Sequence, residues 1–214
     1  MTIRAILFDL DDTLYPRSAG VMIKIRERIL AYMRSRLELS AEEADELRRR
    51  YLHEYGTTMR GLQIHHHIEA DDYLDFVHDV PLHDYIRPNP ALDRALASLP
   101  QQKVVFTNAS REHALRVLDV LGVTHHFDRI VDVRDVGFES KPRPAAYRRV
   151  CEMLDLRPEE CVLVEDNVRN LRPAKELGMT TVLVGSAVDD AEDVVDHAIA
   201  RVEEIAGVLG CQQS

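Results

Sequence analysis

The sequence has no apolar run long enough to cross a membrane. Its 214 residues are 45% hydrophobic, which is enough for a buried core. No stretch approaches the roughly 18–20 consecutive apolar residues of a membrane-spanning helix. The chain begins Met-Thr-Ile-Arg and enters an apolar segment directly, without the charged and apolar regions of a signal peptide. We therefore expect a cytoplasmic protein without a membrane partner.

Cysteine is scarce, and positive charge is not in excess. The three cysteines, Cys151, Cys161 and Cys211, are too few and too widely spaced for a disulfide framework or a zinc pattern. We predict that Cys151 and Cys161 are small core residues. The chain has 27 Lys and Arg against 37 Asp and Glu, a net charge of −10, which argues against nucleic acid as a main partner. A site for an anionic ligand would have to supply its own local cations.

The chain also lacks internal repeats and low-complexity segments. Its length suits one domain with an insertion, or two small domains. Buried strands are expected where short apolar runs alternate with helical patterns, which implies right-handed crossovers and a parallel sheet. The tail, residues 194–209, is expected to add an edge strand and a closing helix. The predicted strands of this Rossmann-like α/β core are residues 6–8, 103–107, 129–133, 161–165 and 181–185.

A long helical segment interrupts this alternation after the first strand. Apolar residues recur at three- and four-residue spacing from Val21 to Leu37, the pattern of an amphipathic helix. Ser40 and Glu43 form a capping box at the start of a second helix. Nothing in the segment predicts a strand. We expect residues 1–15 and 86–214 to form the α/β core and residues 16–85 to form an inserted all-helical domain.

Carboxylates follow the first predicted strand immediately, at Asp9, Asp11 and Asp12, with Thr13 next. The carboxyl edge of a parallel sheet is where open α/β folds bind their ligands. Asp9 and Asp11 point to the same side of an extended segment and repel each other. That arrangement is tolerable if a cation lies between them or if one is protonated. The alternative is a polar turn that closes the strand and caps the next helix.

The stretch Asp-Leu-Asp-Asp-Thr from Asp9 resembles the first signature of the haloacid dehalogenase-like hydrolases, which are mostly phosphatases. Later segments resemble the remaining signatures in order: Thr107-Asn108, then Lys141, then Glu165-Asp166-Asn167. Taken singly, the first two of these segments have a plainer explanation. Thr107 or Asn108 could cap a helix, and Lys141 could be a solvated surface lysine. The ordered set is far more specific than any member.

The resemblance implies an aspartyl-phosphate mechanism. Asp9 would be the nucleophile and Asp11 the general acid and base. Asp9, the backbone carbonyl of Asp11 and Asp166 would hold Mg²⁺. Because a halide leaves without a proton, the presence of Asp11 favours phosphoryl transfer over dehalogenation. Asp12 is expected to serve the local turn.

Other residues would support this chemistry. The resemblance gives Thr107, Asn108 and Lys141 the role of holding phosphate oxygens. Glu165 and Asn170 would support the metal ligands without binding the ion directly, Glu165 either by contacting those ligands or through a water molecule.

The resemblance also implies that residues 16–85 form a cap that selects the substrate. Residues 9–16, 55–62, 165–167 and 170–175 resemble the pyrimidine 5'-nucleotidase branch, although Arg143 and Asn167 depart from its pattern. A nucleoside 5'-monophosphate is the predicted substrate, with a sugar phosphate, phosphoglycolate or an inactive binding role as alternatives. Residues 56–61 could be a substrate loop carrying Arg60, or only an interhelical connection. The histidine run 65–67 is expected to have a surface or lid role rather than to bind metal.

Overall fold

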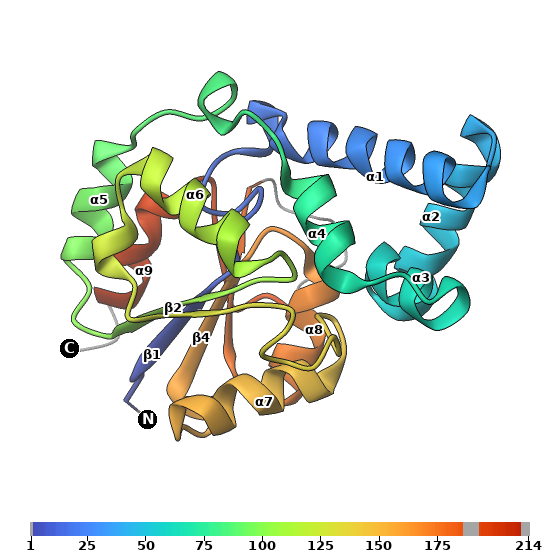
Figure 1. Ribbon diagram of the computed structural model, residues 1–214. Helices are drawn as coiled ribbons and strands as arrows, with labels where there is room; N and C mark the ends of the chain where they lie inside the picture. Colours follow the sequence, from blue (N-terminus) through green and yellow to red (C-terminus); the bar gives the residue numbers. More distant parts are fainter. Residues whose placement is uncertain (1, 186–192, 211–214) are drawn as a thin grey trace. The chain divides into compact units, whose positions relative to one another are not determined.

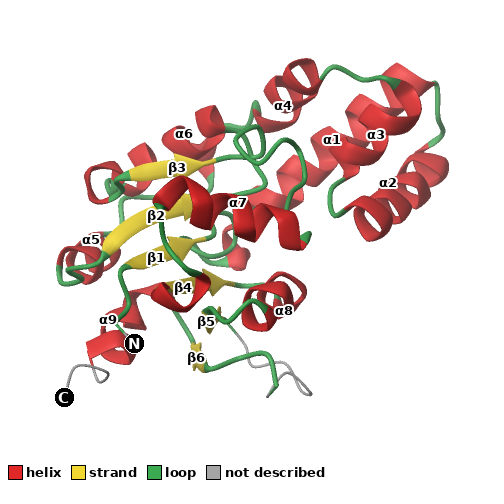
Figure 2. Cartoon of the chain, turned by 90° about the horizontal axis from the view of Figure 1, so that it is seen from below, coloured by secondary structure: helices red, strands yellow, loops and turns green. Residues whose placement is uncertain are grey.

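The computed structural model describes residues 2–185 and 193–210. Its core is a six-stranded sheet in the order β3-β2-β1-β4-β5-β6, with every pair of neighbours parallel (Figures 1 and 2). The predicted Rossmann-like α/β fold is confirmed, as are the buried cysteines Cys151 and Cys161, whereas Cys211 lies outside the described residues. The strands are β1 (Ala5–Phe8), β2 (Gln102–Phe106), β3 (Arg129–Val131), β4 (Cys161–Glu165), β5 (Thr180–Val184) and β6 (His197–Ile199).

The first strand lies at the centre of the sheet, and all of its residues are buried. Phe8 at its end is in register with Val105 of β2 and Val164 of β4. Continuous apolar strands of this kind are typical of parallel sheets covered on both faces. The register brings the residues that follow these three strands to one edge of the sheet.

Helices cover both faces of the sheet (Figures 1 and 2). One face carries α5 (Pro90–Ala97), α6 (Arg111–Leu121) and α9 (Ile205–Gly210), and the other carries α7 (Pro144–Leu154) and α8 (Val168–Glu176). Right-handed crossovers from β1 through β2 to β3, and from β3 through β4 to β5, place the helices in this way. The described residues also include five short 3₁₀ turns: Arg17–Ala19, Leu82–Asp84, Thr124–His126, Pro158–Glu160 and Val202–Glu204.

Gly20–Tyr85 is a separate compact unit, and the residues before and after it form the other. It is entirely helical, with α1 (Val21–Leu37), α2 (Ala41–Tyr55), α3 (Thr58–His66) and α4 (Ala70–His78). The predicted capping box is present at the start of α2. The Ser40 hydroxyl accepts a bond from the Glu43 amide, and the Glu43 carboxylate accepts one from the Ser40 amide.

The predicted loop over residues 56–61 is only a two-residue connection. Gly56 ends α2 with a φ of 84°, and Thr57 caps α3 by accepting a bond from the Arg60 amide. Arg60 and Gly61 are therefore helical. The prediction that residues 56–61 form a loop is wrong, whereas the substrate role of Arg60 stays a prediction. Gly61 is needed for packing, because a Cβ there would lie 2.2 Å from Cγ of Tyr51. Among the helices that the structure describes, none has the length and apolarity to cross a membrane.

Replacing Gly61 with alanine should destabilise the helical unit by about 1–3 kcal/mol, because the new methyl group overlaps the Tyr51 ring. Gly207→Ala is the matched control, since a Cβ at that helical position meets nothing within 4 Å. That control should be neutral or slightly stabilising. Urea unfolding followed by circular dichroism measures both changes. Equal effects of the two substitutions would contradict the packing explanation.

Candidate active site

A buried lysine joins residues from three distant parts of the chain. Nζ of Lys141, in the loop before α7, lies 2.7 Å from Oδ1 of Asp9 and 2.8 Å from Oε2 of Glu165. The Lys141 side chain is only 1% exposed, so the alternative of a solvated surface lysine is wrong. Asp9 follows β1 and Glu165 ends β4. The strand register therefore creates the contact that the sequence could only suggest.

The carboxylates of Asp9, Glu165 and Asp166 form a cluster in which an oxygen from each lies within 4.8 Å of the others. Lys141 supplies one positive charge against these three negative groups. Carboxylate oxygens are the ligands that Mg²⁺ prefers. The donor set and its excess of negative charge therefore fit a hard divalent cation.

The pKa values in the cluster show the same imbalance. Burial raises the pKa of Asp9 to about 7, helped by the nearby charge of Glu165 and opposed by Lys141. Burial likewise raises the pKa of Glu165 to about 7 and that of Asp166 to about 6. Burial alone would lower the pKa of Lys141, but Asp9 and Glu165 outweigh it and the pKa is raised. The Lys141 ammonium therefore stays charged, but its single positive charge does not offset the burial and mutual repulsion of the carboxylates.

Asp9 is held at both carboxylate oxygens. Its Oδ1 accepts the bond from Lys141, and its Oδ2 accepts a 3.0 Å bond from the Thr13 hydroxyl. Its backbone amide donates to the Val164 carbonyl of β4 at 2.9 Å. These contacts fix the orientation of the predicted nucleophile before any substrate arrives.

Asp11 has two partners that the sequence did not predict. The Tyr15 hydroxyl donates to Oδ1 of Asp11 at 2.5 Å, and Nε2 of His113 lies 2.9 Å from the same oxygen. His113 is buried on α6 beside Ala114 and Val117. Its place on the apolar face predicts only a core histidine, because β1 and α6 are far apart in the sequence. Its contact with Asp11 becomes visible only in the folded chain.

Asp12 serves the turn, in line with the expectation for it. Its φ of 61° places it in the left-handed region, which Asp tolerates better than most residues. Its carboxylate forms a 4.0 Å ion pair with the neighbouring Arg17. Burial and the charge of Asp11 raise the pKa of Asp12 to about 6.

Thr107 and Asn108 lie at the end of β2, but neither caps the following helix. Ser110 is the N-cap of α6, so the helix-cap alternative is wrong. The Asn108 amide instead bonds the backbone of Lys141 in both directions, donating to its carbonyl at 2.8 Å and accepting from its N–H at 2.9 Å. The Thr107 hydroxyl accepts a bond from the Ala109 amide. Asn108 therefore positions the loop that carries Lys141, a role that the sequence did not indicate.

The remaining predicted residues have other observed contacts. Asn167 caps α8 by accepting a bond from the Arg169 amide, and the Asn170 carbonyl accepts one from the Tyr147 hydroxyl at 2.6 Å. Arg60 lies on α3 of the helical unit.

Two members of the histidine run are partnered by tyrosines of the same unit. The ring nitrogen Nε2 of His65 lies 2.7 Å from the Tyr55 hydroxyl, and that of His66 lies 2.9 Å from the Tyr51 hydroxyl.

Comparisons with known proteins identify the family of this chain. The family model of the haloacid dehalogenase-like hydrolases matches residues 3–178. The chain belongs to this family. It is 31% identical to the glyceraldehyde 3-phosphate phosphatase of Methanopyrus kandleri, over 97% of each chain. It is 28% identical to the Saccharomyces cerevisiae phosphate metabolism protein 8, over 91% of this chain and 66% of the yeast protein. The chain therefore spans about two thirds of that relative.

Solved structures share the fold of this family member. An HAD phosphatase from Thermococcus onnurineus superposes with a TM-score of 0.65 at 22% identity, covering 97% of this chain and 98% of the other. An L-2-haloacid dehalogenase from Xanthobacter autotrophicus superposes with a TM-score of 0.62 at 16% identity, covering 98% and 99%. The predicted superfamily is confirmed, and these distant neighbours establish the fold alone.

The raised carboxylate pKa values predict how Mg²⁺ stabilisation depends on pH. Asp9, Glu165 and Asp166 hold protons in the folded protein up to about pH 6–7, but lose them near pH 4 when unfolded. The metal-free protein should therefore lose stability as pH rises from about 4 to about 7, because the unfolded chain releases these protons first. Mg²⁺ requires ionised ligands. The rise in melting temperature on adding Mg²⁺ should thus grow from about pH 5 to about pH 8; a rise that is constant or larger in acid would refute this.

Replacing Lys141 with methionine should destabilise the protein by about 3–5 kcal/mol at about pH 8, because buried carboxylates lose their counter-charge. The loss should shrink near pH 5, where Asp9 and Glu165 can take up protons. Lys103→Met is the matched control, since the buried Lys103 bonds the carbonyls of Leu99 and Gln101 instead. Urea unfolding at both pH values measures the difference. The same pH dependence in both variants would rule out the charge explanation.

Proposed function

We propose that this protein is a Mg²⁺-dependent phosphatase that hydrolyses a small phosphomonoester through an aspartyl-phosphate intermediate. The observation that carries the proposal is the buried Lys141, which bonds both Asp9 and Glu165 beside Asp166. Phosphoryl transfer needs fixed positive charge beside a carboxylate nucleophile, and this cluster provides it. The phosphatase names of two relatives support the same chemistry.

The first step joins Asp9 to phosphorus. A carboxylate oxygen of Asp9 attacks the phosphorus atom, the bond from phosphorus to the leaving oxygen breaks, and Asp11 gives that oxygen its proton. In the second step Asp11 removes a proton from water, whose oxygen attacks the same phosphorus. The bond to Asp9 then breaks, which releases inorganic phosphate and restores both carboxyl groups.

Asp9, the backbone carbonyl of Asp11 and Asp166 would hold Mg²⁺. When bound, the ion neutralises charge on the phosphate and on the carboxylates that surround it. Glu165 would not bind the ion directly; it would hold Lys141 in place by accepting its hydrogen bond. Lys141, Thr107 and Asn108 would bind phosphate oxygens as cationic and hydrogen-bonding groups. Asn170, in the first turn of α8, would support the metal ligands without binding the ion itself.

Asp11 favours phosphoryl transfer over dehalogenation. An alkoxide leaving group needs a proton, whereas a halide does not. The contacts with the Tyr15 hydroxyl and with Nε2 of His113 would hold the Asp11 carboxyl group in place for this proton transfer. Distant likeness to dehalogenases reflects the shared fold, and the presence of Asp9, Asp11 and Lys141 makes an inactive binding protein the weaker alternative.

The predicted substrate is a pyrimidine nucleoside 5'-monophosphate, selected by residues 16–85 acting as a cap and by Arg60 meeting anionic groups. The alternative is another small phosphate such as a sugar phosphate or phosphoglycolate. Three relatives are named glyceraldehyde 3-phosphate phosphatase, which favours a small sugar phosphate as the substrate. A cytoplasmic location without a nucleic-acid partner remains our expectation.

Phosphate release from nucleotides, sugar phosphates, glyceraldehyde 3-phosphate and phosphoglycolate distinguishes these substrates. Release should require Mg²⁺ and stop with chelator. Preference for UMP or CMP would support the nucleotide prediction, and preference for a triose or sugar phosphate would replace it. No release from any compound, by a protein that binds Mg²⁺, would favour the inactive binding alternative.

The acid role of Asp11 predicts a dependence on the leaving group. Asp11→Asn should lower turnover of an alkyl phosphate by about 10²–10⁴-fold, the usual contribution of a positioned acid or base. The first step with p-nitrophenyl phosphate should change far less, because nitrophenolate leaves without a proton. Burst kinetics separates that step from hydrolysis of the intermediate. Asp12→Asn is the matched control, and equal losses in the first step with both substrates would argue against the role of Asp11.

A further inference from the structure

A second group of potential metal ligands lies in the α/β core, outside the proposed catalytic site. It consists of Asp93 on α5 and the adjacent residues His125 and His126 in the 3₁₀ turn between α6 and β3. Nε2 of His126 lies 2.8 Å from Oδ1 of Asp93, and Nε2 of His125 lies 3.3 Å from the same oxygen. One potential ligand atom from each of the three residues lies within 4.8 Å of those of the other two.

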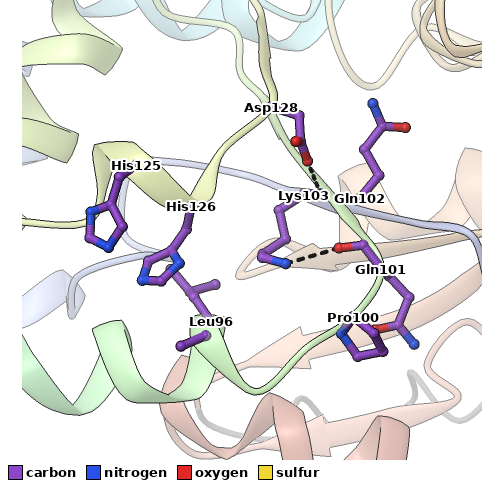
Figure 3. Close-up of a pocket in the computed structure, with 9 residues that line it drawn as sticks. Leu96, Pro100, Gln101, Gln102, Lys103, His125, His126 and Asp128 are labelled. Atoms are coloured by element: carbon purple, nitrogen blue, oxygen red, sulfur yellow. Dashed lines mark hydrogen bonds between the residues drawn. The ribbon is translucent and has the colours of Figure 1, made fainter.

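The two imidazole rings face the same way, which is unusual for neighbours in sequence. Their centroids are 4.0 Å apart, and Figure 3 shows both side chains extending in the same direction from the turn. The adjacent His65 and His66 of α3 instead bond two different tyrosines. The backbone of the Thr124–His126 turn therefore does what a regular helix does not: it directs consecutive histidines at one carboxylate.

The distances suit a single bound ion. Zinc binds imidazole nitrogen and carboxylate oxygen at about 2.0–2.2 Å, so ligands around it lie roughly 3–3.5 Å apart. The two separations from the Asp93 oxygen are already close to that range. Asp93 and His125 have side chains 42% and 65% exposed, whereas His126 is 11% exposed. An ion could thus enter from solvent, bind one anchored ligand and two adjustable ones, and keep water in its fourth position.

The chemistry of the donors separates this group from the catalytic cluster. Two imidazoles with one carboxylate favour zinc-class transition ions, whereas an all-carboxylate cluster suits Mg²⁺. The location also differs. His125 and His126 line a pocket of about 450 Å³ with Lys103 and Asp128, at the start of β2 and before β3 (Figure 3). These are the amino ends of parallel strands, and the catalytic carboxylates lie at the carboxyl ends.

We propose that Asp93, His125 and His126 form a binding site for a zinc-class divalent transition ion. The ion would link α5 to the turn between α6 and β3. Its role would be structural or regulatory, because it lies at the sheet edge opposite to the proposed catalytic residues.

Calorimetric titration of the full chain with Zn²⁺, in excess Mg²⁺, tests the site. The wild type should bind one more tight equivalent than either His126→Ala or Asp93→Asn. Loss of a supporting residue alone costs about 10–100-fold in metal affinity, so loss of a ligand should weaken binding at least about tenfold. His125→Ala, at an exposed position, should give the same direction of change with the fold intact. Equal Zn²⁺ binding by the wild type and all three variants would overturn the proposal.

Two controls locate the bound ion. His65→Ala/His66→Ala and Asp166→Asn should both retain the tight equivalent, because they alter the other histidine pair and the catalytic cluster. With Cu²⁺ as a probe, electron paramagnetic resonance should show nitrogen coupling that disappears in His125→Ala/His126→Ala. Nitrogen coupling that survives in this variant would place the ion elsewhere. Phosphate release by His126→Ala should equal that of the wild type, so failure of the phosphatase proposal would leave the Zn²⁺ result interpretable.

Discussion

The buried ammonium of Lys141 is the constraint on which the rest of the site depends. It neutralises part of the charge of Asp9 and Glu165, and lies 5.0 Å from the centre of the Phe106 ring. A buried charge of this kind is tolerable only with close partners. The chain therefore has to place β1, the end of β4 and the Lys141 loop within fixed distances, and Asn108 holds that loop at both its N–H and its carbonyl.

The positive charge of Lys141 balances only part of the negative charge of the carboxylate cluster, and the remaining negative charge favours binding of a cation. One ammonium cannot neutralise three carboxylates, so the pKa values of the carboxylates rise and a further cation is favoured. A protein with a net charge of −10 can accept an anionic phosphate only where positive charge is concentrated locally. Lys141 and the proposed Mg²⁺ would provide it at the carboxyl edge of the sheet, where open α/β folds bind ligands.

The sequence was most informative where the chemistry is local. Apolar strands and capping signals predicted the sheet and the helical segment, and carboxylates directly after strands marked the edge where they meet. Contacts between distant segments were not accessible. Nothing near His113 indicates Asp11, and an amide at Asn108 suggests a phosphate or a helix cap as readily as a loop 33 residues away. Gly61 falls in the segment predicted as a possible substrate loop, although its real constraint is the Tyr51 ring, which depends on the packing of α2 against α3.

The central claim is that Asp9 carries the phosphoryl group. Asp11→Asn, mixed with Mg²⁺ and p-nitrophenyl phosphate and quenched rapidly in acid, should accumulate phosphate on the protein because the second step lacks its base. Mass spectrometry of the peptides should place that phosphate on Asp9, and Asp9→Asn should carry none. A burst of nitrophenolate without any phosphorylated peptide, or phosphate on another residue, would contradict the account.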